Sequence, residues 1–106
     1  HTHTHNVMSR MDDPTLQQEV QLSIGLLKEN LGVRVRHYSY TEGQETHYNG
    51  RVISRLQQDG VVCAPTAIAG LNPCGSDPFQ LKRVMVGFMG TPFPFWDQTL
   101  EPEMLR

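Results

Sequence analysis

Segments with helical periodicity alternate along this chain with short segments of strand periodicity. The first, a predicted helix, has Asp13 at the N-cap position, Pro14 at the first helical position and Gly32 at its C-terminal end. Its apolar residues recur at steps of three and four, which predicts one buried stripe made of Leu16, Val20, Ile24, Leu27 and Leu31. Such alternation is typical of β/α units, so we expect an α/β fold.

The later predicted elements are shorter and continue the same pattern. A strand is predicted at 33–40, where β-branched and aromatic residues recur at strand spacing, and a helix is predicted at 48–59. Residues 61–64 form a wholly apolar run of the kind that is buried in a parallel sheet, and 81–86 is a further predicted strand. A short helix is expected to begin at Asp77.

Size and charge exclude several classes of protein. The 106 residues carry a net charge of −2, which gives no electrostatic footprint for nucleic acid or for an anionic membrane surface. No apolar run approaches the roughly 20 residues that a transmembrane helix needs, so no transmembrane segment is expected in this chain. The first residue is His1 and not Met, and we therefore expect that the chain was cut from a longer protein.

The first five residues contain the densest group of potential metal ligands, namely His1, His3 and His5. In an extended strand His1 and His5 would lie ~13 Å apart, too far to share one ion, and His1 with His3 would be the chelating pair. In a turn or a helix, His1 and His5 approach each other instead. Spacing alone leaves both pairings open. A remnant of an expression tag is the alternative without function for this segment.

A catalytic zinc site needs a third protein ligand and an open position for water. No residue is singled out for that role by its spacing. The candidates within this chain are Asp12, Asp13, His37, Glu42 and His47.

The histidine segment resembles the second motif of the NodB-type polysaccharide deacetylase family, which is a His, a Ser or Thr, two residues and a second His. The run His37–Gly43 is similar to the third motif of that family, in which an aromatic strand leads into a Pro-aromatic-Gly loop. The helix and strand over 52–66, and the loop and strand over 70–83, occur in the same order in many members. The resemblance covers roughly residues 1–86.

This resemblance implies a partial, distorted (β/α) barrel. Residues 1–90 would be the C-terminal part of the catalytic domain, followed by a tail rich in Pro and aromatic residues at 91–106. The resemblance also implies a metal site, usually zinc, with His1 and His5 as ligands and His3 as an intervening residue. An Asp pair upstream of His1 would supply the base and the third ligand, so no catalytic residue is assigned in this chain. A barrel cut in this way would expose apolar surface.

The sequence departs from the family pattern at the third motif. Ser39 stands where an arginine that orients the base is common, as in a subgroup of the family. Thr41 and Glu42 replace the Pro and the aromatic residue before Gly43, and the backbone N–H of Glu42 would then contact the oxyanion. The family's late Leu-His motif, which provides the general acid, has no counterpart, because no histidine follows His47.

The resemblance implies hydrolysis of N-acetyl or O-acetyl groups on an acetylated polysaccharide or oligosaccharide, by a longer enzyme at an extracytoplasmic or cell-envelope location. The candidate substrate-binding residues are Tyr38, Tyr40, Glu42 and Trp96, and packing in the core is the alternative role of the aromatic side chains. Arg83 is expected in a salt bridge rather than on the substrate. The alternative function is that of a non-catalytic metal-binding or carbohydrate-binding α/β domain.

Overall fold

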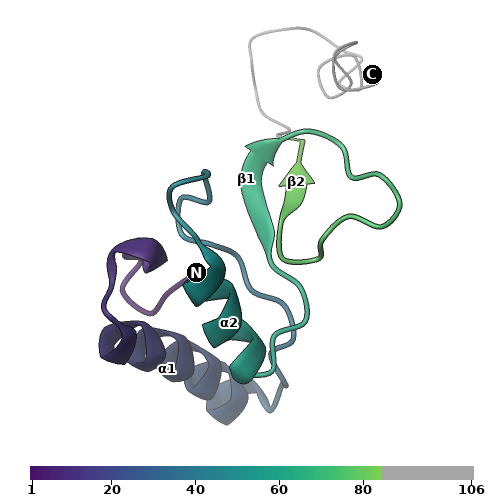
Figure 1. The fold of residues 1–106 in the computed structure, drawn as a ribbon. Helices are drawn as coiled ribbons and strands as arrows, with labels where there is room; N and C mark the ends of the chain where they lie inside the picture. Colours follow the sequence, from purple (N-terminus) through teal and green to yellow (C-terminus); the bar gives the residue numbers. More distant parts are fainter. Residues whose placement is uncertain (85–106) are drawn as a thin grey trace, which may run out of the picture.

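The computed structural model describes residues 1–84 of the chain. It contains a 3₁₀ turn at Met8–Arg10 (η1), helices α1 (Asp13–Leu31) and α2 (Gly50–Gln58), and strands β1 (Pro65–Ala69) and β2 (Leu81–Arg83). The two helices lie together at one end of this region and the two-stranded sheet lies at the other (Figure 1). Helices combined with a small parallel sheet agree with the predicted α/β class.

Helix α1 agrees with the predicted helix except at its first residues. The N-cap is Asp12 and not Asp13, because the Asp12 carboxylate accepts a hydrogen bond from Thr15 N at 2.9 Å. Hydrogen bonds from Thr15 also lower the pKa of Asp12. Asp13 and Pro14 then occupy the first turn, where a negative charge and a missing N–H are both tolerated. Gly32 ends the helix in the left-handed conformation, with a φ of 65°.

Only the first half of the predicted apolar stripe on α1 is buried. Leu16 and Val20 belong to the core, and Ile24 packs partly against it. Leu27 and Leu31 are 45% and 67% exposed, which contradicts the prediction for this half of the stripe. Helix α2 has 9 residues and α1 has 19, so α2 is too short to cover the whole stripe. The C-terminal half of α1 therefore presents apolar side chains to solvent within the described region.

The predicted strand at 33–40 is extended but does not form a regular strand. Its only pairing among residues 1–84 is one parallel bridge between His37 and Cys63. Two hydrogen bonds close this bridge: Val62 N to Arg36 O at 2.8 Å and Tyr38 N to Cys63 O at 3.0 Å. The backbone N–H groups of residues 33–35 donate no backbone hydrogen bond within residues 1–84. These residues therefore form no strand in the described region, although their composition favours one.

Strands β1 and β2 run parallel, with Pro65 opposite Leu81 and Ala69 opposite Arg83. The two ends of this pairing are separated by more residues in β1 than in β2, so β1 carries an irregularity between Pro65 and Ala69. Ala64 N also donates to Pro78 O at 2.9 Å, just before the sheet begins. The extended segments before α2, after α2 and at β2 therefore lie side by side in one direction.

Two predicted elements differ from the observed ones at this sheet. The strand predicted at 61–64 is displaced, because regular pairing begins only at Pro65. The helix expected at Asp77 is a turn, in which Asp77 Oδ1 accepts a hydrogen bond from Phe79 N at 2.9 Å. Strand β2 realises the first three residues of the predicted strand at 81–86, and residues 85 and 86 lie outside the described region.

The core lies where α1 and α2 meet the extended segments. Its fully or nearly buried apolar residues are Met8, Leu16, Val20, Tyr38, Tyr40, Val52, Leu56, Val61, Ala64 and Phe79. Arg51 on α2 forms an ion pair with Asp13 at 2.7 Å and donates to Met11 O at 2.6 Å, which joins α2 to the start of α1. Among residues 1–84, no helix is long and apolar enough to cross a membrane.

We expect Leu56→Ala to destabilise the protein by ~2–5 kcal/mol, because Leu56 has no exposed surface and its removal leaves a cavity between α2 and the core. Leu31→Ala is the matched control, because the Leu31 side chain is largely exposed, and we expect only a few tenths of a kcal/mol there. Urea denaturation measures both changes. Equal losses for the two variants would contradict the position of the core.

Candidate functional site

The N-terminal histidines lie in a turn that folds back on itself. His5 N donates to Thr2 O at 3.4 Å, and His5 adopts a left-handed φ of 63°. This bend brings the rings of His1 and His5 to a centroid distance of 5.0 Å with an interplanar angle of 55°. Of the two pairings that spacing leaves open, the structure therefore brings His1 and His5 together, with His3 exposed in the turn between them.

The distance between the two rings suits ligands of one metal ion. A zinc ion binds an imidazole nitrogen at ~2.0–2.1 Å, and so lies roughly 3.2 Å from the ring centroid. Two imidazoles at about the tetrahedral angle then have centroids roughly 5 Å apart, as observed for this pair. His1 Nδ1 lies 3.1 Å from Ser39 O, so an N–H there donates to this carbonyl and leaves Nε2 to bind. Within residues 1–84, no group of three or more His, Cys, Asp or Glu residues is arranged to hold a metal.

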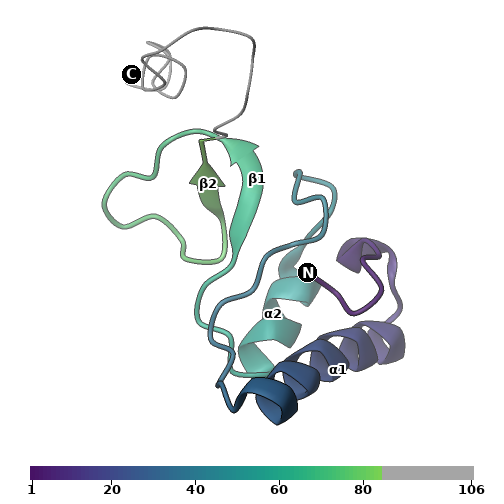
Figure 2. The same cartoon turned by 180° about the vertical axis from the view of Figure 1, so that it is seen from behind.

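Threonine contacts join the histidine turn to the loop before α2. Thr2 is buried, and its hydroxyl donates to Asn6 O at 3.0 Å. Thr2 N donates to Thr41 Oγ1 at 3.4 Å, and Thr41 has no exposed surface. Figure 2 shows the N-terminal segment beside the long loop that joins α1 to α2. These buried hydroxyls fix the position of His1 against Ser39.

Helix α1 holds the same turn from the other side through Glu19. Its Oε2 atom accepts hydrogen bonds from Thr4 N at 2.8 Å and from Thr4 Oγ1 at 3.0 Å. Thr4 Oγ1 in turn accepts from Asn6 Nδ2 at 2.8 Å. The position of Glu19 in the sequence does not indicate a role in the site, because its partner Thr4 lies 15 residues away. The carboxylate restrains the residue that lies directly before His5.

Glu42 and Gly43 form a tight turn directly after the extended segment. Glu42 is exposed with a φ of 64°, and Gly43 N donates to Thr41 O at 2.8 Å across it. The Glu42 N–H has no acceptor among residues 1–84. Gly43 has a φ of 73° and lies against β1, where its carbonyl accepts from Ala67 N at 2.8 Å. The turn is thus fixed by backbone contacts on its C-terminal side.

The candidate aromatic residues lie in the core. Tyr38 is 7% exposed, and its hydroxyl lies 2.9 Å from Ser23 Oγ; burial raises the pKa of its phenol. Tyr40 is 2% exposed and donates to Phe79 O at 2.7 Å, and burial also raises its pKa. The Tyr40 ring stacks on that of Tyr48 at 4.4 Å. The hydrogen bond and the stacking of Tyr40 favour a role in packing the core over a role in substrate binding. The fourth candidate, Trp96, lies outside the described region.

A pocket of about 380 Å³ opens beside His1. We call it the His1–Arg83 pocket, and its lining residues are His1, Ser23, Leu27, Val35, His37, Tyr38, Ser39, Pro65 and Arg83. Arg83 Nη2 donates to Ser39 Oγ at 2.8 Å. The expected salt bridge of Arg83 is not formed within residues 1–84. Nothing in the sequence indicated that Arg83 reaches Ser39. The structure brings the Arg83 guanidinium from β2 to Ser39, the residue that stands where an arginine is common.

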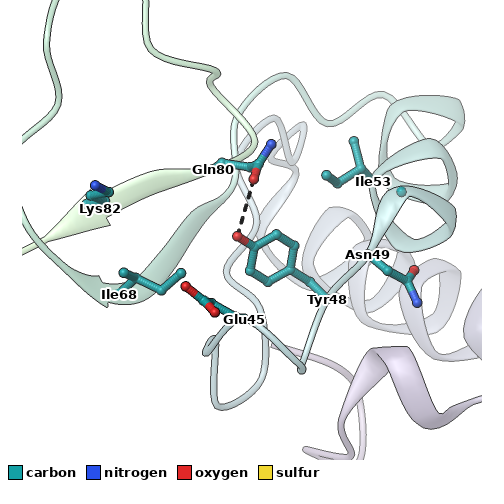
Figure 3. A pocket seen from close by; sticks show the side chains of 8 residues that line it. Glu45, Tyr48, Asn49, Ile53, Ile68, Gln80 and Lys82 are labelled. Carbon is teal, nitrogen blue, oxygen red and sulfur yellow. Dashed lines mark hydrogen bonds between the residues drawn. The ribbon is translucent and has the colours of Figure 1, made fainter.

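A second hollow of about 590 Å³, the Tyr48 groove, lies between α2 and the sheet. Figure 3 shows the Tyr48 ring between the start of α2 and the sheet, with its hydroxyl 3.5 Å from Gln80 Oε1. Lys82 lines this groove, whereas Arg83 lines the His1–Arg83 pocket. Consecutive residues of a strand point to opposite faces, so the two hollows lie on opposite faces of the sheet. None of the candidate site residues within residues 1–84 lines the Tyr48 groove.

The comparison with known families identifies the chain. A family model described as polysaccharide deacetylase matches residues 1–64, which is more than half of the sequence. The chain belongs to the polysaccharide deacetylase family. No curated protein and no solved structure matches it significantly.

The matched region of this polysaccharide deacetylase chain contains both paired histidines and the Glu42 turn. Strands β1 and β2, with Arg83, follow it. Members of the polysaccharide deacetylase family act on acetylated carbohydrates. The histidine turn, its Thr41 and Glu19 contacts and the Glu42 turn therefore form the candidate functional site.

We expect Gly43→Ala to destabilise the chain by ~1–3 kcal/mol, because an added Cβ would lie 2.7 Å from Ala67 N at a residue with positive φ. Gly25→Ala is the control: it lies within α1, nothing lies within 4 Å of its added Cβ, and we expect it to stabilise by about 0.5–1 kcal/mol. Thermal or urea unfolding measures whether each substitution lowers or raises the free energy of unfolding. Stabilisation by Gly43→Ala would contradict the close approach of the Glu42 turn to β1.

Proposed function

We propose that this chain is part of a metal-dependent hydrolase that removes acetyl groups from a polysaccharide or oligosaccharide, with His1 and His5 as two ligands of a zinc ion. One observation carries the proposal: the two histidines lie in the region that matches the deacetylase family, and their rings are 5.0 Å apart. An Asp pair upstream of His1 is proposed to supply the third ligand and the base.

The chemistry of the proposed site follows from the groups that surround it. A zinc ion bound there would polarise the acetyl carbonyl and lower the pKa of a bound water to about 7. Ser39 O orients the His1 ring by accepting its Nδ1–H, and Glu19 restrains the turn before His5. The Glu42 N–H, which has no acceptor within residues 1–84, is proposed to donate to the oxyanion of the tetrahedral intermediate.

We also propose that residues 1–90 belong to the C-terminal part of a distorted (β/α) barrel, with 91–106 as a tail. The support is the shared direction of three extended segments: the His37–Cys63 bridge is parallel, and so is the pairing of β1 with β2. The exposed apolar side chains of α1 are surface that further elements of such a barrel would cover.

The structure favours fewer residues as substrate contacts than the sequence alone indicates. Tyr38 lines the His1–Arg83 pocket and Glu42 is exposed beside the site, so both stay candidates. The Tyr40 hydroxyl is bonded to Phe79 O and its ring is covered by Tyr48, which favours a packing role. Trp96 stays a candidate on its sequence alone.

We expect His5→Ala in the full-length protein to lose bound zinc and deacetylation together, because one of two paired ligands is removed. His3→Ala is the matched control and should retain both. Zinc content is measured by mass spectrometry, and acetate release is measured on N-acetylated chitooligosaccharide and on O-acetylated xylan. The comparison of the two substrates decides between nitrogen and oxygen deacetylation.

Unchanged zinc content in His5→Ala would remove His5 from the ligand set. A wild-type protein that binds the oligosaccharides but releases acetate from neither would favour the alternative of a carbohydrate-binding domain.

We expect Glu19→Gln to weaken zinc binding by ~10–100-fold, since groups that orient metal ligands have effects of this size. The substitution replaces the carboxylate that accepts two hydrogen bonds from Thr4. Glu29→Gln on the exposed surface of the same helix is the control and should leave zinc affinity unchanged. Competition with a chromogenic chelator measures the affinity. Equal affinities in the two variants would show that Glu19 does not restrain the histidine turn.

A further inference from the structure

The Tyr48 groove lies on a face of the sheet that the connection between the strands does not cover. Parallel strands are usually joined through a helix that packs on the sheet. Between β1 and β2 the chain instead forms a loop over residues 70–80, which contains no helix. The groove of about 590 Å³ is therefore open between α2 and the sheet, and its volume lies in the range of small-molecule sites, ~300–1,000 Å³.

Tyr48 gives this groove a flat apolar wall that is fixed in place. Its ring stacks on that of Tyr40 at 4.4 Å and 14°, and Tyr40 is 2% exposed. The Tyr48 hydroxyl donates to Gln80 Oε1 at 3.5 Å. Ile53 and Ile68 are half-buried and lie on either side of the ring (Figure 3). Because Tyr40 covers one face of the Tyr48 ring, the face that lines the groove is the other one.

Polar side chains around the ring are held by the fold and keep groups for a ligand. Asn49 Oδ1 accepts from Val52 N at 3.0 Å, and Asn49 Nδ2 has no partner within residues 1–84. The Asn72 amide donates to Lys82 O at 2.9 Å and accepts from Lys82 N at 2.8 Å. The Lys82 stem lies over Gly70, where an added Cβ would be 2.7 Å from its Cδ atom. The Lys82 ammonium forms no ion pair within residues 1–84.

The charges around the groove favour a neutral ligand. Among the described residues that line it, the charged ones are Glu45 and Lys82, whose charges are opposite. Burial and the Glu45 carboxylate raise the pKa of Tyr48, so its hydroxyl stays neutral. A sugar ring fits such a surface, because its C–H groups pack on an aromatic face and its hydroxyls both donate and accept hydrogen bonds.

We propose that the Tyr48 groove binds a neutral segment of a carbohydrate chain, with a sugar ring packed on Tyr48 and its hydroxyls bonded to Asn49, Gln80 and Lys82. The groove lies on the opposite face of the sheet from the His1–Arg83 pocket, so this site holds the chain and takes no part in hydrolysis. The choice of a carbohydrate rests on the family and on the proposed function, whereas the geometry of the groove does not.

Methyl NMR of the full-length protein, labelled at isoleucine δ1-methyl groups, tests this site. N-acetylated chitooligosaccharide and neutral xylooligosaccharide are the two probes, and at least one of them should shift the signals of Ile53 and Ile68. Ile24 on α1 lines neither hollow and should not shift. The same titration of His5→Ala should give an unchanged affinity at the groove, because His5 does not line it.

Two substitutions in the groove should weaken this binding. We expect Gln80→Ala to lower the affinity roughly tenfold, because hydrogen bonds to the ligand and to Tyr48 are lost. Tyr48→Ala removes the stacking face and should lower the affinity further. Gln57→Ala is the matched control, because Gln57 is exposed on α2 and does not line the groove.

Three results would each overturn the proposal: neither neutral probe shifts the Ile53 and Ile68 signals, only a carboxylated chain such as polygalacturonate shifts them, or both groove variants bind as tightly as the wild type. If the wild-type protein releases no acetate but these signals still shift, the proposed function fails and the carbohydrate site stands. The failure of one is thus distinguishable from the failure of the other.

Discussion

The extended segment Tyr38–Thr41 carries the contacts on which the candidate site depends. Consecutive side chains of an extended segment point to opposite sides. On one side, the hydroxyls of Tyr38 and Tyr40 are bonded to Ser23 and to Phe79 O, which anchors the segment in the core. On the other side, the hydroxyls of Ser39 and Thr41 accept hydrogen bonds from Arg83 and from Thr2 N. The backbone carbonyl of Ser39 accepts from the His1 ring. A short stretch of chain thus joins the core directly to the site.

Polar contacts, and not apolar burial, shape the histidine turn. His5 adopts a left-handed backbone conformation that is unfavourable for a residue with a side chain. The cost is offset by hydrogen bonds on both sides of the turn, from Thr2 to Asn6 and from Thr4 to Glu19. A turn held in this way keeps its two imidazoles close without covering them, which is what a site open to a carbohydrate requires.

The helices could be predicted because their signals are local. Asp13 and Pro14 indicate the start of α1, and Gly32 indicates its end. The predicted N-cap, Asp13, differs by only one residue from the observed one, Asp12. Helix α2 likewise lies inside its predicted range, 48–59. The helix expected at Asp77 is wrong, because the Asp77 side chain bonds to the backbone two residues later and makes a turn instead.

The strands were less predictable, because a strand is completed by partners far away in the sequence. Residues 33–40 have strand composition but pair only at His37, and regular pairing after α2 begins at Pro65, after the predicted run has ended. The exposure of Leu27 and Leu31 has the same origin, since helical spacing defines an apolar face but not the length of the element that covers it.

The sequence by itself determined the α/β class, the two helices and the family, because periodicity, caps and motif order are properties of neighbouring residues. It left the histidine pairing open by spacing, and only the resemblance favoured His1 with His5. The tertiary structure decided which imidazoles meet, since a left-handed residue closes the turn. It also decided that Glu19 and Arg83 reach the site, because their partners lie 15 and 44 residues away and are brought near only by folding.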